Sequence, residues 1–173
     1  MKILVLSDSH GRQELMRFAV HATKPNAIIH LGDHFDDATE LSEAYPHLTM
    51  HQVPGNCDYG RIYGIHPETI YYKVCGVTLF MTHGHNHDVK QSLSSLLWSA
   101  RSSSAEAALF GHTHIPYCDK EPGGLWVLNP GSCRLLSGSV GLIEVEDHQI
   151  LSCRILRRRA EIRYSPLSSC LAV

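Results

Sequence analysis

The sequence lacks the features that mark membrane, secreted and strongly charged proteins. Its uninterrupted apolar runs are well short of the roughly 20 residues that a membrane-spanning helix needs. Its first residues lack the charged, apolar and small-residue order of a leader peptide. A formal net charge of -2 gives no electrostatic reason to expect a membrane or a nucleic acid as partner. We therefore expect a cytoplasmic protein with neither partner.

The cysteines also lack the spacing that would indicate a zinc ribbon or a disulfide framework. All 6 are scattered and no CxxC pair occurs. A chain of 173 residues can bury a core without such cross-links, and it contains no internal repeat. We predict one domain over residues 1–156 and a C-terminal tail over residues 157–173. The arginine run at residues 157–159 is most simply a solvated end.

Apolar periodicity predicts alternating strands and helices in the first third of the chain. A continuous apolar run predicts a buried strand at residues 3–6, a mostly apolar run predicts a second at residues 27–31, and residues 48–53 are predicted as the third strand. Between them, helical stripes consist of Leu15, Phe18, Ala19 and Ala22, and then of Ala38, Leu41 and Tyr45. Such β-α-β-α-β connections make parallel sheet, so the carboxyl ends of the three strands should share one edge.

The remaining two thirds of the chain are predicted to form mainly strands. A hairpin is predicted from residues 69–74 and 77–81, with its turn at Cys75-Gly76. A helix with Leu93, Leu96, Leu97 and Ala100 on one face precedes a short strand at residues 107–110. Antiparallel strands are predicted at residues 125–128, 139–145 and 150–156.

Five polar clusters stand where predicted strands give way to loops. They are Asp8-Ser9-His10, Gly32-Asp33, Gly55-Asn56-Cys57-Asp58, His83-Gly84-His85 and Gly111-His112-Thr113-His114. In an open α/β sheet this edge is where ligands bind. A single Asp or His at a strand end is usually a polar residue with no such role. Five clusters in this order, each behind an apolar run, make a chance arrangement very improbable.

The side chains in these clusters suit divalent cations. Asp8 and His10 lie two residues apart and project to the same side, and His112 and His114 repeat this spacing. One carboxylate can bridge two cations, and Asp33 follows a glycine that permits a sharp turn. Oxygen and imidazole ligands without thiolate favour Mn, Fe, Co, Ni or Zn. The candidate ligands are Asp8, His10, Asp33, Asn56, His83, His112 and His114.

These motifs, followed by Asn129-Pro130-Gly131-Ser132, resemble those of the calcineurin-like metallophosphoesterases. Within that superfamily, the chain resembles the small bacterial and archaeal phosphodiesterases over residues 1–156. The resemblance implies an α/β fold, a four-layer α/β/β/α sandwich of two mixed sheets flanked by helices. It also implies two metal sites that share Asp33, the first completed by Asp8, His10 and His114 and the second by Asn56, His83 and His112.

The function that the resemblance implies is hydrolysis of a small phosphodiester by attack of a metal-bridging hydroxide. Two divalent ions are expected, Mn²⁺ first, with Ni²⁺, Fe²⁺, Zn²⁺ or Co²⁺ as the other choices. A phosphomonoesterase or a nucleotide pyrophosphatase with the same site is an alternative. A scaffold is a further alternative, since the small fold also resembles the scaffold subunit of the retromer coat. The sequence does not decide whether the chain forms a homo-oligomer.

Cys57 stands where many relatives carry a histidine that protonates the leaving group. No Cys-x5-Arg phosphate loop surrounds it, and a thiol with a pKa near roughly 8.5 is a poor acid, so neither a nucleophilic nor an acidic role is expected. The predicted catalytic residues are His85, ahead of His34 and His87, and Asp58 in a supporting position. For His85, orientation of a metal-bound phosphate is an equal alternative to protonation of the leaving group. We expect faster turnover of esters with acidic leaving groups, in an open site without a cap domain.

Overall fold

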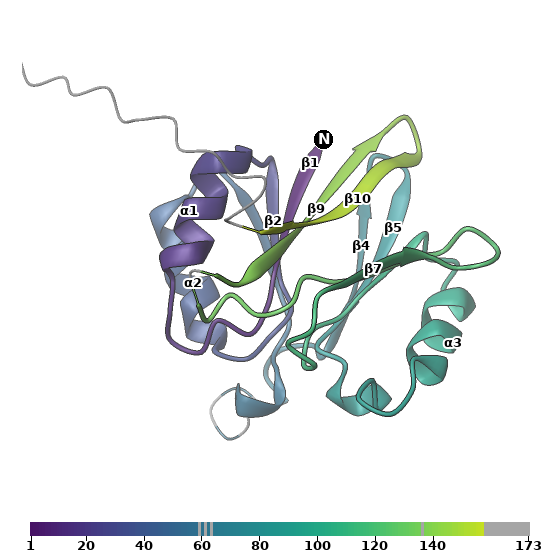
Figure 1. Cartoon of the computed structure of the whole chain (residues 1–173), viewed down its shortest axis with the longest axis horizontal. Helices are drawn as coiled ribbons and strands as arrows, with labels where there is room; N and C mark the ends of the chain where they lie inside the picture. Colours follow the sequence, from purple (N-terminus) through teal and green to yellow (C-terminus); the bar gives the residue numbers. More distant parts are fainter. Residues whose placement is uncertain (59, 61, 63, 136, 158–173) are drawn as a thin grey trace, which may run out of the picture.

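Two five-stranded sheets form the centre of the molecule (Figure 1). The computed structural model describes residues 1–58, 60, 62, 64–135 and 137–157. The first sheet contains β1 (Lys2–Leu6), β2 (Ala27–His30), β3 (Thr49–Gln52), β9 (Ser139–Glu146) and β10 (Gln149–Arg157). The second contains β4 (Thr69–Val74), β5 (Val77–Thr82), β6 (Ala107–Leu109), β7 (Tyr117–Lys120) and β8 (Trp126–Asn129).

The first sheet has the strand order β10-β9-β1-β2-β3. Its β1, β2 and β3 are parallel, as the predicted β-α-β-α-β unit requires, and the helices between them are α1 (Glu14–Thr23) and α2 (Phe35–Ala44). The hairpin of β9 and β10 adds antiparallel strands next to β1. Arg157 therefore ends β10 rather than beginning a tail, and the rest of the predicted tail lies outside the described residues.

The second sheet has the order β4-β5-β6-β8-β7 and corrects one part of the sequence prediction. The β4–β5 hairpin has the predicted extent and turn. However, β8 runs parallel to β6, whereas only antiparallel strands were expected after residue 125. The missing partner is β7, a half-exposed edge strand that pairs antiparallel with β8. Its sequence, Tyr-Cys-Asp-Lys, has no apolar alternation that would have predicted a strand.

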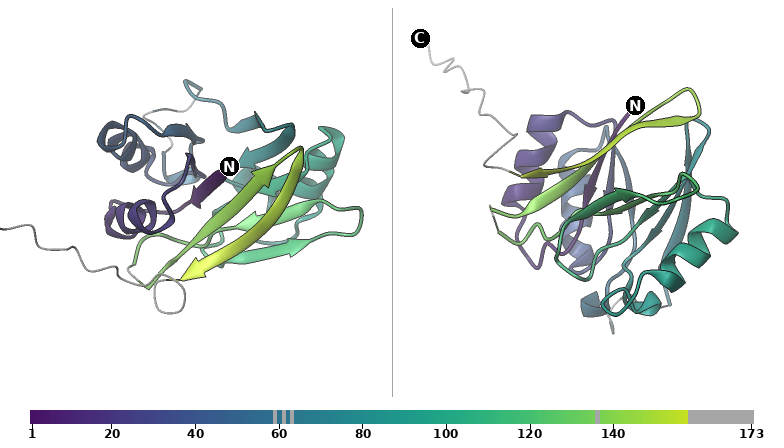
Figure 2. Two further views of the ribbon diagram at one scale, coloured as in Figure 1. Left: turned by 90° about the horizontal axis from the view of Figure 1, so that it is seen from above. Right: turned by 45° about the vertical axis from the view of Figure 1, so that its right-hand side comes forward.

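Helices cover the outer face of each sheet (Figures 1 and 2). Helices α1 and α2 flank the first sheet, and α3 (Ser94–Ser102) lies against the second. The buried face of α1 is rotated from the predicted stripe: Met16 and Val20 are buried, whereas Phe18 is half-buried and Ala22 is exposed. Tyr45 and Leu93 were predicted inside helices but occupy a C-cap and an N-cap position, respectively.

Three apolar clusters fill the spaces between the layers. The largest lies between the two sheets and includes Ile3, Val5, Leu79 and Leu109. Leu4 and its neighbours on the other face of β1 pack against α1, and a third cluster lies beneath α3. A strand buried on both faces reads as a continuous apolar run, which explains the pattern at residues 3–6. The predicted four-layer α/β/β/α sandwich is confirmed.

Within the described part of the chain, no helix has both the length and the apolar character needed to cross a membrane.

Candidate metal centre

The five polar clusters converge at one end of the sandwich, in the loops that follow β1, β2, β3, β5 and β6. Five of the seven candidate ligands have backbone φ angles between 49° and 66°, in the left-handed region that side-chain-bearing residues seldom adopt; they are Asp8, His10, Asp33, His112 and His114. Such strain persists only where surrounding structure enforces it, and it concentrates at functional sites.

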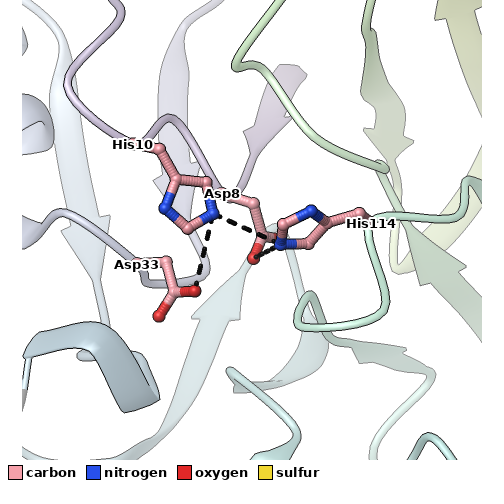
Figure 3. A group of neighbouring side chains, drawn as sticks. All are labelled: Asp8, His10, Asp33 and His114. Atoms are coloured by element: carbon pink, nitrogen blue, oxygen red, sulfur yellow. Dashed lines mark hydrogen bonds and ion pairs between the residues drawn. The ribbon is translucent and has the colours of Figure 1, made fainter.

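Asp8, His10, Asp33 and His114 form the first group, with ligand atoms that all lie within 4.8 Å of one another (Figure 3). Nε2 of His114 lies 3.1 Å from Oδ1 of Asp8 and 3.3 Å from Nε2 of His10. Nε2 of His10 lies 3.7 Å from Oδ2 of Asp33. Two ligands about 2.1 Å from one ion lie about 3.0 to 3.4 Å apart at right-angled or tetrahedral geometry. Two of these three separations have the spacing of ligands to one cation, and the third is slightly longer.

Asp8 is fully buried, and half of its carboxylate has no hydrogen bond. Oδ2 accepts bonds from the Ser7 hydroxyl (2.5 Å) and the His112 N–H (3.2 Å), whereas Oδ1 accepts none and faces His114. Burial alone raises the pKa of Asp8, but His114, His83 and Ser7 outweigh burial and hold this pKa below its usual value. The contact with Asp8 in turn raises the pKa of His114. A buried carboxylate oxygen without a donor fits a bound cation.

His83 organises a second group of ligand atoms. Its Nδ1 lies 2.6 Å from the carbonyl oxygen of Leu31, which can only accept, so Nδ1 carries a proton, and in the neutral imidazole Nε2 then has a free lone pair. Nε2 lies 3.1 Å from Oδ1 of Asn56 and 3.4 Å from Oδ1 of Asp33. These three atoms are then all hydrogen-bond acceptors, so they cannot form hydrogen bonds with one another. A cation among them would satisfy all three, and a backbone-anchored imidazole is the usual metal ligand.

His112 completes the second group. Its ring centroid lies 5.1 Å from that of His83, and its backbone N–H is bonded to Asp8 of the first group. Burial, together with the neighbouring His83, lowers the pKa of His112 to about 4. The imidazole is therefore neutral at physiological pH, which is the form that coordinates a metal.

The carboxylate of Asp33 divides between the two groups. Oδ1 faces His83, and Oδ2 faces His10 on the other side. Asp33 is 2% exposed, and its Oδ1 accepts the backbone N–H of Cys57 at 2.9 Å. The side chain therefore has the position that a shared ligand between two cations would need. The structure brings all seven predicted metal ligands into these two adjoining groups.

Asp58 fixes the loop that carries Asp33. Its two oxygens accept four backbone N–H groups, those of Asp33 (3.1 Å), His34 (2.9 Å), Phe35 (2.9 Å) and Gly55 (2.7 Å). Two of these donors open α2, where a carboxylate is also favoured by the helix dipole. These contacts place Asp58 behind Asp33, where it holds the backbone of this loop.

The three histidines that could protonate the leaving group lie in different places. His85 is half-buried, and its ring centroid is 5.3 Å from that of His83. Burial, followed by His83, lowers the pKa of His85. His34 is exposed, with its ring 5.4 Å from that of His10. His87 instead contacts Ser95 and Phe80 at the side of α3. His85 and His34 therefore border the two groups of ligands, and His87 does not.

Cys57 is exposed beside Asp33 and is protonated at neutral pH. Partial shielding from water, a hydrogen bond with Asp33 and the charges of nearby carboxylates raise its pKa to about 11. A thiol with so high a pKa is neither a nucleophile nor an effective acid at neutral pH. This agrees with the expectation that Cys57 does not replace the histidine of the family motif.

Two residues with no role assigned from the sequence hold the centre together. The Asn129 side-chain amide donates to the Gly111 carbonyl (2.8 Å), and its oxygen accepts the N–H of Gly131 (2.8 Å). The Ser132 hydroxyl donates to the Asp8 carbonyl at 2.7 Å. Both belong to the Asn129-Pro130-Gly131-Ser132 motif, which was visible in the sequence. The contacts of Asn129 with Gly111 and of Ser132 with Asp8 were not visible, because they join segments more than 15 residues apart.

Comparison with known proteins gives consistent matches. Residues 1–148 match the family model described as the calcineurin-like phosphoesterase superfamily domain. The chain is 33% identical over 138 residues to a probable metallophosphoesterase, YsnB, of Bacillus subtilis strain 168, covering 78% of this chain and 76% of that protein. A similar protein of Mycoplasma pneumoniae, also named a probable metallophosphoesterase, is 29% identical over 137 residues, with 78% and 80% covered.

Solved structures show the same architecture. A conserved protein of Streptococcus pneumoniae TIGR4, described as a predicted phosphoesterase, superposes with a TM-score of 0.74 at 27% identity, covering 95% of this chain and 93% of that one. Vps29 of Entamoeba histolytica, solved in complex with Zn²⁺, has a TM-score of 0.67 at 21% identity, with 91% and 98% covered. At that level of identity, the Vps29 likeness shows a shared fold alone.

Proposed function

Because this chain belongs to the calcineurin-like phosphoesterase superfamily, we propose that it is a metal-dependent phosphodiesterase acting on small phosphodiesters. Two divalent cations would be held at the centre. The first would be bound by Asp8, His10, Asp33 and His114, and the second by Asp33, Asn56, His83 and His112. Mn²⁺ is the first choice for both, since carboxylate, amide and imidazole ligands without thiolate suit it.

The division of Asp33 between the two groups is the observation that carries this proposal. A carboxylate that only stabilised the fold would not need oxygens facing two separate sets of acceptor atoms. Bound divalent cations supply Lewis-acid activation of water and offset the negative charge that develops on a reacting phosphate. The chain itself supplies imidazoles, two buried carboxylates and the hydrogen bonds that hold them in place.

Access to the centre supports action on substrates in solution. The His114 side chain is 43% exposed, so the first group of ligands opens at the surface. Small diesters can therefore approach this group from the solvent side of His114. We therefore also propose broad acceptance of small diesters in vitro.

Two other functions are testable with the same protein. A phosphomonoesterase would use the same ligands, so only substrate preference separates it from the diesterase. A scaffold would not need seven competent metal ligands gathered at one end of the fold, five of them with strained backbones. That gathering favours an enzyme over a scaffold.

The deciding experiment removes the shared carboxylate. Metal-stripped protein is assayed on bis(p-nitrophenyl) phosphate and on p-nitrophenyl phosphate after addition of Mn²⁺, Ni²⁺, Zn²⁺ or Mg²⁺ in turn. Loss of an outer contact to a metal ligand already lowers activity by about 10- to 100-fold. Asp33→Asn should therefore lower diester turnover and bound metal at least about a hundredfold.

Asp36→Asn is the matched control for Asp33→Asn. Asp36 lies three residues further along the chain, in the first turn of α2 and exposed, so its substitution should leave diester turnover and metal content unaltered. Metal-dependent turnover of the monoester alone would favour a phosphomonoesterase over a phosphodiesterase. Absence of metal-dependent turnover of either ester would favour a scaffold.

A further inference from the structure

A basic pocket adjoins the metal centre. It has a volume of about 420 Å³ and is lined by residues that include His114, Pro116, Ser132, Arg134, Leu135 and Arg157. This size is within the range that accommodates small molecules. His114 belongs to both the pocket and the first group of metal ligands, so the pocket and the metal centre adjoin at this imidazole.

The two arginines in this pocket are unpaired in the described part of the chain. Arg101 and Arg154 lie close to glutamates, at 3.8 Å and 3.1 Å, whereas Arg134 and Arg157 have no ion pair with any described residue. The described lining also contains no carboxylate. The net charge of the protein is -2, so these two guanidinium groups, unpaired among the described residues, have a charge opposite to that of the molecule as a whole. Such a pair suits an anion, and guanidinium is the group that binds phosphate in bidentate geometry.

The loop that carries Arg134 is tied to the strand end that carries Asp8. The Ser132 hydroxyl donates to the Asp8 carbonyl at 2.7 Å and accepts the backbone N–H of Arg134 at 3.2 Å. The backbone N–H of Cys133 donates to the Ser7 carbonyl at 3.0 Å. The backbone at Arg134 is therefore fixed relative to the metal ligands. Arg157 reaches the same pocket from the end of β10.

We propose that this pocket binds a second phosphate group of the substrate, on the arm of the diester that lies towards His114. The inference rests on the proposed phosphodiesterase function and names its substrate class, which is a small phosphodiester that carries a further phosphate. Arg134 and Arg157 are the specificity-determining residues. A phosphate near neutral pH has a charge of about -1.5 to -2, which matches two guanidinium groups. Pro116 and Leu135 offer apolar contact to the linker between the phosphates.

Binding of matched phosphates tests this pocket directly. Isothermal titration calorimetry of the Mn²⁺-loaded protein compares butyl phosphate with butane-1,4-diyl bisphosphate, which differ by the second phosphate alone. Charge-assisted hydrogen bonds are among the stronger ones, so the bisphosphate should bind about tenfold more tightly or better. This preference should decrease as salt is added, because the pocket is open to solvent.

Substitutions then assign the preference to the arginines. The double variant Arg134→Gln/Arg157→Gln should reduce the ratio of the two affinities to within about twofold. Arg101→Gln, which removes an exposed arginine on α3, should leave the ratio unaltered. Should circular dichroism show that the double variant is unfolded, each single variant is expected to lower the ratio by about threefold or more. Equal binding of both ligands by the parent, or an unaltered ratio in these variants, would overturn the proposal.

Turnover of bis(p-nitrophenyl) phosphate by the same preparations separates this inference from the proposed function. A parent protein that hydrolyses the diester but does not prefer the bisphosphate would reject the pocket and retain the phosphodiesterase. A parent that prefers the bisphosphate through the two arginines, yet hydrolyses no ester, would retain the binding site and reject the enzyme.

Discussion

Single residues at this centre have distinct tasks that their contacts define. Asp33 faces both groups of ligands, Asp58 holds the backbone around Asp33, and His83 is oriented by a backbone carbonyl. Cys57 is the departure from the family motif, and its raised pKa keeps it protonated. Two of these residues give predictions that separate positioning from chemistry.

Asp58→Asn should weaken metal binding and stability together. An amide has one acceptor oxygen where the carboxylate has two, so some of the four backbone N–H groups lose their partner. We expect the free energy of unfolding to fall by about 2 kcal/mol and the metal affinity to fall by about 10- to 100-fold. Urea unfolding of the metal-free protein and metal titration measure these effects. An equal stability loss with unaltered metal affinity would show that Asp58 serves the fold alone.

Cys57→His should reduce the dependence of the rate on the leaving group. In the parent, no histidine at this position protonates the departing alcohol, so acidic leaving groups such as nitrophenol should be favoured. The variant should raise turnover of alkyl esters relative to nitrophenyl esters by about tenfold or more. The slope of log kcat against the pKa of the leaving group measures this effect. Cys57→Ser, which offers no such acid, should keep the parent slope.

At the scale of elements, the centre depends on close approach of two loops. A Cβ atom at Gly55 would lie 2.2 Å from Oδ1 of Asp33 and 2.3 Å from its backbone nitrogen. The loop after β3 therefore contacts the loop after β2 at a distance that only glycine permits. The sequence shows that position 55 is a glycine, but the requirement for glycine comes from a contact between two separate strand ends.

Gly55→Ala should consequently displace Asp33. Because the clash involves backbone, relief requires movement of a loop, and we expect a loss of about 1 to 3 kcal/mol of stability. Metal affinity should also fall, since the shared carboxylate moves. Gly124→Ala in the turn between β7 and β8 is the control: its φ of 93° strains an alanine, but no other atom lies within 4 Å of the added Cβ. Thermal unfolding and metal titration should show lower stability in both variants and weaker metal binding in Gly55→Ala alone.

At the scale of the whole molecule, a buried histidine links stability to pH. His30 is fully buried at the end of β2, with its ring near the Ser9 hydroxyl and the Gly32 N–H. Burial lowers the pKa of His30 to about 4, although Asp8, Asp37 and Asp58 oppose this effect. The unfolded chain binds a proton on His30 as the pH falls through about 6.5, and the folded chain does so only near about 4.

Stability should therefore fall as the pH decreases from about 6.5 to about 4, because only the unfolded chain gains the proton in this interval. The contribution of His30 is full above about pH 6.5, and its loss reaches about 3 kcal/mol. His30→Asn keeps an acceptor near Gly32 but does not titrate, so its stability should depend less steeply on pH. Urea unfolding of both proteins across this range measures the difference. Parallel curves would exclude His30 as the cause.

Local pattern was sufficient for most elements of this fold. A continuous apolar run predicted β1, and mostly apolar runs predicted β2 and β5, because strands buried on both faces need apolar side chains at most positions. The local sequence pattern did not predict β7, whose half-exposed residues follow no apolar pattern. It also did not predict the direction of β8, which depends on the neighbouring strands. On α1, Ala22 was wrongly expected inside because a stripe of apolar residues does not fix the rotation of a helix against a sheet.

The sequence by itself determined which side chains can hold cations, because carboxylate, amide and imidazole groups keep their chemistry wherever they lie. It also determined that these groups follow strands, since apolar runs are a local property. The tertiary structure alone decided that Asp33 divides between two groups, that Asp58 collects four backbone N–H groups, and that Arg134 and Arg157 line one pocket. Each of these facts joins segments distant in the chain, and such contacts arise only from the packing of the two sheets.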